Sequence, residues 1–214
     1  MVKVKTEKAA SKKLFIPAPN LQTVRIKIKG TAPLVMNKFS QKAKQGMIDD
    51  QMIGKTATKR KREPKDFNAN YEASKHISSK GWCGIPAPAF RNSMIETCRL
   101  VDIKMTQARR MLFIEADDFD TTEGTPLVKI TKGKPYRFDA QVRLPNGAFD
   151  IKARAMWDSG WEAELRITFN ADFLTIKDIT NLLSQAGLMN GILEGRPGSR
   201  NSSGMGWGLF KIIK

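Results

Sequence analysis

The sequence predicts a mixed α+β fold, and three kinds of segment carry that prediction. Residues 24–29 and 161–169 alternate apolar and polar side chains, which is the period of a half-buried strand. The segments that follow Ile85 and Thr175 place apolar side chains three and four positions apart, as amphipathic helices do. With the shorter apolar runs between and after them, these segments give the order strand, helix, strand, strand, helix, strand.

The first twenty residues differ in composition from the rest of the chain. They are rich in Lys, Ala and Ser and then carry prolines, so residues 1–20 are expected to form a mobile basic arm. The first strand follows, and in it Val24, Ile26 and Ile28 alternate with basic residues up to Gly30. The alternation places three cations on one face of a sheet, namely Arg25, Lys27 and Lys29.

A helix and a basic segment are predicted next. Residues 37–50 space apolar side chains such as Ala43 and Met47 four apart, which favours a helix. Residues 54–70 are basic and carry almost no apolar side chains. They indicate either a solvated loop or a segment that becomes ordered only on binding.

The remaining elements follow in sequence. The helix after Ile85-Pro86-Ala87-Pro88 has a buried stripe made of Phe90, Met94, Ile95, Cys98 and Val101. A short strand is predicted at 110–115, an acidic turn at 116–124, and strands at 127–130, 136–144 and 151–156 around a tight turn at 145–147. After the strand at 161–169, a helix is expected at 175–186 with Gly187 as its stop, then a glycine-rich loop and a terminal strand.

This order of elements is that of the ferredoxin-like or RRM-like β-α-β-β-α-β unit. Residues 21–214 are therefore predicted to form a single domain with two insertions. Residues 31–84 insert a basic, helical excursion, and residues 116–160 extend the central hairpin. A chain of 214 residues, of which 41% are hydrophobic, is long enough to bury a core.

Composition restricts the classes of partner. The formal net charge of +16 exceeds what solubility requires and favours a polyanion as partner. The chain has no apolar run of about 18 residues, so no membrane partner is expected. No apolar segment follows the N-terminal charges, and a cytoplasmic location is therefore expected. Cys83 and Cys98 lie too far apart for a CxxC pair and the chain has one histidine, so we expect no metal and no cofactor.

The C-terminal region combines glycines, arginines and a tryptophan. Gly195-Arg196-Pro197-Gly198-Ser199-Arg200 is followed by Gly204-Met205-Gly206-Trp207-Gly208 and then by the apolar terminal strand. Glycines let the backbone approach a phosphate chain closely, while the arginines neutralise it and the indole offers a stacking face. Dinucleotide and P-loop motifs lead from a strand into a helix, whereas this loop leads into a strand. The loop therefore favours nucleic acid as the ligand.

Two segments resemble the RAMP superfamily, especially the backbone subunits of CRISPR surveillance complexes. The segment Ile85-Pro86-Ala87-Pro88-Ala89-Phe90-Arg91-Asn92 is similar to the start of that superfamily's first helix. The segments Gly198-Ser199-Arg200 and Gly206-Trp207-Gly208-Leu209-Phe210-Lys211 resemble its glycine-rich loop and last strand. The chain departs from the family pattern where Ala87 and Pro88 replace a glycine-serine pair and where residues 201–205 are inserted. Its compact size and divergence also resemble relatives encoded by phages and prophages, for which the location would be the host cytoplasm.

The resemblance implies a palm domain with a thumb-like hairpin, whose subunits polymerise side by side along a single strand. We therefore expect a non-enzymatic protein that binds single-stranded RNA or DNA, with RNA favoured, and self-associates into a filament or ring. The candidate contacts are Lys38, Lys42, Lys59, Arg60, Lys61, Arg62, Lys65, Trp82, Arg91, Arg196, Ser199, Arg200 and Trp207. Arg25, Lys27 and Lys29 join this set if their face of the sheet is uncovered.

Two alternatives stay open. The first is a metal-dependent ribonuclease of the same fold, because related processing nucleases use a histidine and some backbone subunits cleave with an aspartate. Its candidate residues are His76, as general acid or base, and Asp117, Asp118 and Asp120, whose oxygens suit Mg²⁺. The second is a phage protein that binds and anneals single-stranded DNA in recombination.

Overall fold

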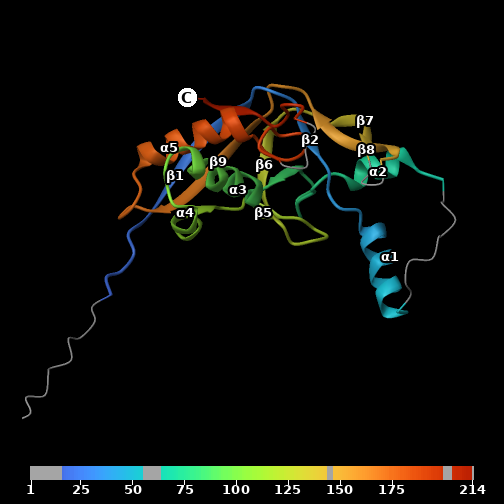
Figure 1. The fold of residues 1–214 in the computed structure, drawn as a ribbon, viewed down its shortest axis with the longest axis horizontal. Coiled ribbons are helices and arrows are strands. Elements are labelled where there is room, and N and C mark those ends of the chain that lie inside the picture. The colour runs from blue at the N-terminus through green and yellow to red at the C-terminus, as the bar shows by residue number, and fades with distance from the viewer. Residues whose placement is uncertain (1–15, 55–63, 144–146, 200–203, 214) are drawn as a thin grey trace, which may run out of the picture.

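The computed structural model describes residues 16–54, 64–143, 147–199 and 204–213, apart from the side chain of Arg143. The chain contains both helices and antiparallel strands, so the expected mixed α+β class is confirmed (Figure 1). Most of the predicted arm, the four basic residues Lys59, Arg60, Lys61 and Arg62, and Arg200 lie outside the described residues.

Most strands belong to one antiparallel sheet with the order β10-β1-β9-β6-β3. The short strands β4 and β5 pair with β9 and β6, respectively. The strands span Phe210–Ile213 (β10), Leu21–Gly30 (β1), Glu162–Asn170 (β9), Pro126–Lys132 (β6), Gly84–Pro86 (β3), Leu112–Ile114 (β4) and Asp118–Phe119 (β5). The two alternating segments of the sequence, now β1 and β9, are thus neighbours at the centre of the sheet.

One face of this sheet is covered by α3 (Ala87–Thr97) and α5 (Ile176–Gln185), which lie in front of it in Figure 1. Phe90 of α3 and Leu183 of α5 are fully buried in the core that they share with strand side chains such as Ile28. The Thr175 and Asp178 side chains form a reciprocal capping box at the start of α5. The apolar stripes predicted from the sequence therefore face the sheet.

The chain does not leave the helical conformation at Gly187, contrary to the expectation. A π-helical turn, η2 (Ala186–Asn190), continues directly from α5. Gly187 is needed there for close packing, because a Cβ atom on it would lie 2.3 Å from the backbone oxygen of Phe210. The glycine lets the end of the helical segment approach the last strand.

A second, three-stranded sheet has the order β2-β8-β7. Its strands are Leu34–Met36 (β2), Phe149–Trp157 (β8) and Tyr136–Arg143 (β7), and α2 (Phe67–Ala73) packs on β8. Strands β7 and β8 are the two arms of the hairpin predicted within residues 116–160. Trp157 at the end of β8 is buried in the same core as the main sheet, so the two sheets share side chains at their junction.

Three helical segments lie at the periphery. Helix α1 (Gln41–Met52) projects away from the sheets and has no buried residue (Figure 1). Helix α4 (Met105–Met111) follows a single 3₁₀ turn, η1 (Cys98–Leu100), and its last turn contains Arg110, which the sequence had placed in a strand. Strand β4 begins only at Leu112. No described helix is long and apolar enough to span a bilayer.

Candidate nucleic-acid interface

The face of the main sheet opposite α3 and α5 is open. Along β1, Ile26 and Ile28 point into the core, and the alternate residues Arg25 and Lys27 are exposed. The side chain of Arg25 is 73% accessible, and Lys29 is half-buried. Arg25, Lys27 and Lys29 were candidate contacts on the condition that their face of the sheet is uncovered. That condition is met.

The last strand adds a further cation beside this row. Lys211 of β10 lies directly opposite Lys29 of β1, on the same face. Within the part of the chain that the structure describes, the ammonium groups of Lys27, Lys29 and Lys211 have no hydrogen-bond or ion-pair partner. Like charges opposite each other across a strand pair destabilise a sheet, so this corner of the face favours an anion.

The carboxylates of the open face are engaged elsewhere. Glu164 is 3.7 Å from the guanidinium of Arg25, and Glu162 is 3.1 Å from the ammonium of Lys132. Arg166 contacts Glu115 at 3.5 Å and Asp117 at 3.3 Å. Exposed pairs of this kind are worth only about 0 to 1 kcal/mol each. Glu164 and Glu162 also lie directly opposite Lys27 and Lys29 on β9 and offset part of their charge, whereas Lys211 faces a lysine and no carboxylate.

The C-terminal loop is held by internal contacts. The Trp207 ring packs edge-on against Phe138 of β7, with the ring centroids 5.7 Å apart. A Cβ atom on Gly195 would lie 2.3 Å from the Trp207 ring, so this glycine is required for the packing. Arg196 donates to the carbonyl of Leu193 at 3.0 Å, and the amide of Ser199 donates to the carbonyl of Arg196 at 3.2 Å. Among the described glycines of this loop, Gly195, Gly198 and Gly208 serve chain packing, whereas a Cβ atom on Gly204 or Gly206 would contact nothing within 4 Å.

Arg91 does not point at the start of its helix. Its Nε donates to the carbonyl of Leu112 at 2.8 Å, its Nη2 donates to the carbonyl of Arg109, and its guanidinium lies over the Phe113 ring. Arg91 therefore satisfies backbone carbonyls at the end of α4 and the start of β4, which is an edge strand. We do not include it among the phosphate contacts.

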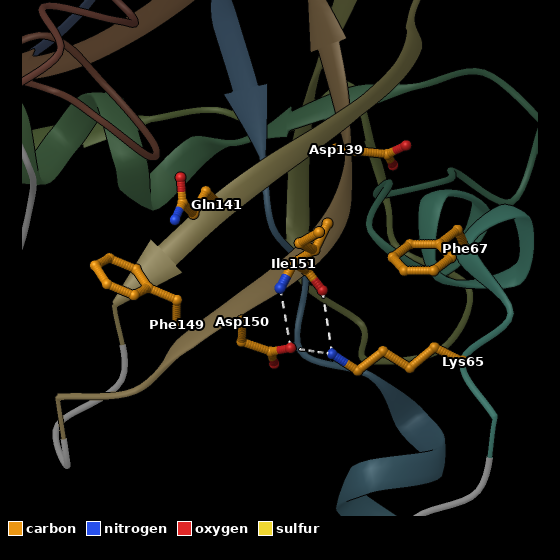
Figure 2. A pocket seen from close by; sticks show the side chains of 7 residues that line it. All are labelled: Lys65, Phe67, Asp139, Gln141, Phe149, Asp150 and Ile151. Carbon is orange, nitrogen blue, oxygen red and sulfur yellow. Dashed lines mark hydrogen bonds and ion pairs between the residues drawn. The ribbon is translucent and has the colours of Figure 1, made fainter.

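Lys65 is also engaged within the chain. Its ammonium binds the Asp150 carboxylate and lies 3.2 Å from the carbonyl oxygen of Ile151, as Figure 2 shows. These groups line an open groove of about 630 Å³ beside the β7–β8 hairpin, together with Phe67, Asp139, Gln141 and Phe149. Of the other candidates, Lys42 is exposed on α1, and Trp82 is half-buried with the Lys129 ammonium 5.9 Å from its ring centre.

Lys38 lies in a buried cluster with two of the proposed catalytic residues. Its ammonium is 2.7 Å from Oδ1 of Asp120, and Nδ1 of His76 is 3.0 Å from Oδ2 of the same carboxylate. The Lys38 and Asp120 side chains are 6% and 0% exposed, so Lys38 is not available to a phosphate. The cluster joins the segments before α1, before β3 and after β5.

Protonation in this cluster follows from burial and hydrogen bonding. Burial of Asp120 by itself would raise its pKa, but hydrogen bonds from Lys38, Thr122 and His76 outweigh burial and hold the pKa far below its usual range. Burial lowers the pKa of His76, against the opposing effect of Asp120. His76 is therefore neutral at pH 7, and its Nδ1–H donates to the carboxylate.

The three aspartates proposed as metal ligands point to different places. Asp117 contacts Arg166 on the open sheet face, Asp118 accepts a hydrogen bond from Ser79 at 2.7 Å, and Asp120 lies in the buried cluster. No group of three or more His, Cys, Asp or Glu side chains that could hold a metal ion occurs within residues 16–54, 64–143, 147–199 and 204–213. The acidic turn gives no geometry for holding a metal ion.

No protein-family model matches this chain, and no curated protein is significantly similar to it.

The sequence pattern did not identify Lys211 as part of the cationic corner. Lys211 lies beside Lys29 because the last strand pairs with the first. The local spacing of residues in the sequence does not reveal this pairing. The available signal was the period of the terminal strand, because Phe210 and Ile212 alternate with Lys211.

Proposed function

We propose that this protein binds single-stranded nucleic acid, with RNA favoured, on the open face of its main sheet, and that it does so without catalysing a reaction. The observation that carries the proposal is the group of unpaired lysines Lys27, Lys29 and Lys211. Lysines that neutralise phosphates release condensed counterions, and this release supplies much of the affinity of nucleic-acid complexes. The net charge of +16 agrees with such a partner.

We further propose that the core is a ferredoxin-like unit related to the RAMP superfamily. The antiparallel strand order β10-β1-β9-β4, with α3 and α5 on one face, supports this assignment. So does the position of the two segments that resemble the superfamily, since one begins α3 and the other precedes and forms β10. In RRM domains a four-stranded sheet binds RNA through bases stacked on its aromatic side chains.

Self-association along the strand is the second part of the proposal. Helix α1 exposes Met47 by 59% and Met52 by 81%, without any buried residue of its own. An isolated helix of twelve residues is marginal in water, and here Lys42 and Lys44 lie near the positive end of the helix dipole. A second copy of the chain, covering the apolar side of α1, would stabilise it. Each copy would then add its phosphate contacts to a strand already held by its neighbour.

Binding and its salt dependence test the proposal. The affinity for labelled single-stranded RNA and DNA of equal sequence is measured by fluorescence anisotropy over a range of salt concentrations. We compare the wild type with the triple variant Lys27→Gln, Lys29→Gln, Lys211→Gln and with a control, Lys80→Gln, Lys104→Gln, Lys177→Gln, which removes the same charge from other exposed sites.

The first triple variant should bind more weakly, and its slope of log affinity against log salt should fall by up to about 2, because each phosphate that is no longer neutralised reduces the slope by about 0.7. The control should retain most of the wild-type slope. Equal slopes for the two triple variants would reject the open face as the site. Tighter binding of DNA, with annealing of complementary strands, would favour the recombination alternative instead.

A further inference from the structure

The open face also carries an exposed aromatic ring at the end away from the unpaired lysines. Phe113 lies in β4 opposite Thr168 of β9, and Thr168 lies opposite Thr23 of β1. Because these residues alternate with buried Leu112 and Phe169, the Phe113 side chain stands on the open face. It is 46% exposed, although phenylalanine is usually buried.

The Arg91 side chain contacts the Phe113 ring at the edge of the sheet. The guanidinium of Arg91 lies over it, 5.4 Å from the ring centre, and is itself fixed by the carbonyls of Leu112 and Arg109. This contact restrains the ring on one side, and Phe113 stays 46% exposed. An aromatic side chain held in this way loses little conformational entropy when a base stacks on it.

A carboxylate that accepts hydrogen bonds from two threonine hydroxyls lies on the same face. Oε1 of Glu115 accepts hydrogen bonds from Thr168 at 2.6 Å and from Thr23 at 3.4 Å. Oε2 of Glu115 lies 3.5 Å from Arg166, and the residue is half-buried. Glu115 follows Phe113 by two positions, so both side chains emerge on the same side of the sheet. A carboxylate retains acceptor capacity beyond these partners, and it repels a phosphate while it accepts from an amino group.

We propose that Phe113 and Glu115 form a nucleobase site, in which a base stacks on the ring and donates its exocyclic amino group to the carboxylate. The inference rests on the proposed function, because the base belongs to the strand whose phosphates contact the lysines. Thr23, which lies in the same cross-strand row as Phe113 with Thr168 between them, and Lys29 are six positions apart on β1, which at about 3.3 Å per residue is roughly 20 Å. The open face thus has a base-binding end and a phosphate-binding end, and one extended stretch of a bound single-stranded nucleic acid reaches both.

Cytosine and uracil provide a matched test of the carboxylate. They have the same ring size, but position 4 of cytosine carries an amino donor and that of uracil a carbonyl acceptor. We measure the affinity of the full chain for labelled oligo-C and oligo-U of equal length, for the wild type and for Phe113→Ala, Phe113→Leu and Glu115→Gln. Phe119→Ala is the control, because Phe119 is 56% exposed in β5, away from β9. Thermal unfolding confirms that each variant is folded.

Wild type should prefer oligo-C, and Glu115→Gln should reduce that preference to near unity, because an amide accepts from cytosine and donates to uracil. Phe113→Ala and Phe113→Leu should each weaken binding about tenfold or more without changing the salt slope, since stacking involves no charge. The control should bind as the wild type does.

The outcomes separate this inference from the function on which it rests. If both Phe113 variants bind like the wild type, or oligo-U binds as well as oligo-C, while the Lys27, Lys29 and Lys211 triple variant is weakened, the nucleobase site is rejected and the phosphate-binding face remains. If neither set of variants changes binding, the open face is not the site and both proposals fail.

Discussion

The imidazole of His76 donates a buried hydrogen bond to the carboxylate of Asp120, 44 residues further along the chain. The same carboxylate holds the ammonium of Lys38. A single acidic residue therefore ties together the segment that leads into α1, the segment before β3 and the turn after β5. The pair has the hydrogen-bond geometry of a His–Asp dyad, and here the carboxylate is shared with the ammonium of Lys38.

The first prediction concerns pH. The pKa of His76 is lowered in the folded state, so its stabilising effect is present above its unfolded value of about 6.5 and is lost as the pH falls below it. The chain has one histidine, and Glu194, whose pKa is raised by burial, contributes with the opposite sign, so a fall in the unfolding midpoint between pH 8 and pH 5 is assigned to His76. Stability should fall across this range in the wild type.

His76→Asn provides the comparison, since it keeps a donor for Asp120 and does not titrate. Its midpoint should vary less between pH 8 and pH 5. Below about pH 4 both proteins should lose stability together, because the lowered pKa of Asp120 makes its contribution disappear as the carboxylate is protonated. An identical decline of the two proteins between pH 8 and pH 5 would show that His76 is not responsible.

The second prediction uses two glycines of the C-terminal loop. Gly208 and Gly206 both have positive φ, 71° and 72°. A Cβ atom on Gly208 would lie 1.9 Å from the carbonyl oxygen of Ile192, whereas nothing lies within 4 Å of one on Gly206. Gly206→Ala should cost about 1 to 2 kcal/mol of unfolding free energy from backbone strain alone. Gly208→Ala should cost substantially more, and similar losses for the two in denaturant titrations would contradict the packing found here.

The third prediction separates stability from binding at Arg91. Because its guanidinium satisfies carbonyls of the chain, Arg91→Gln should lower the free energy of unfolding by about 1.5 to 3 kcal/mol. The salt slope of nucleic-acid binding should stay at the wild-type value, since the number of neutralised phosphates is the same. Arg110→Gln, an exposed arginine of the same region, is the control and should leave stability nearly unchanged. A reduced salt slope in Arg91→Gln alone would restore Arg91 as a phosphate ligand.

The fourth prediction concerns self-association through α1. Replacing Met47 and Met52 by Gln keeps helix propensity but removes exposed apolar surface. Sedimentation velocity with a long single-stranded oligonucleotide should then show smaller assemblies than the wild type forms. The double variant Asp49→Gln, Asp50→Gln changes two residues whose mean direction is opposite that of the two methionines on the same helix, and it should leave assembly intact. Unchanged assembly in the methionine variant would exclude α1 as the contact between copies.

The sequence pattern was informative where local periodicity decides the structure. The alternation in β1 correctly indicated which side chains leave the core, and Asp178 correctly indicated the start of α5. It could not tell which cations are already neutralised. Lys38 and Arg91 have the sequence context of free charges, yet their partners lie 82 residues away at Asp120 and 21 residues away at the Leu112 carbonyl. Such pairings are set by tertiary contacts.

The cross-strand neighbours Lys29 and Lys211 have a consequence for the folding equilibrium itself. Strand β10 has only four residues and pairs with β1 alone among the described strands, so its attachment is weakened by this repulsion. Any polyanion that neutralises both ammonium groups binds the attached form more tightly than the detached one, and by linkage it must shift the equilibrium toward attachment. Resistance of the C-terminal strand to proteolysis should therefore rise with ligand concentration, so that the end of the chain reports whether the face is occupied.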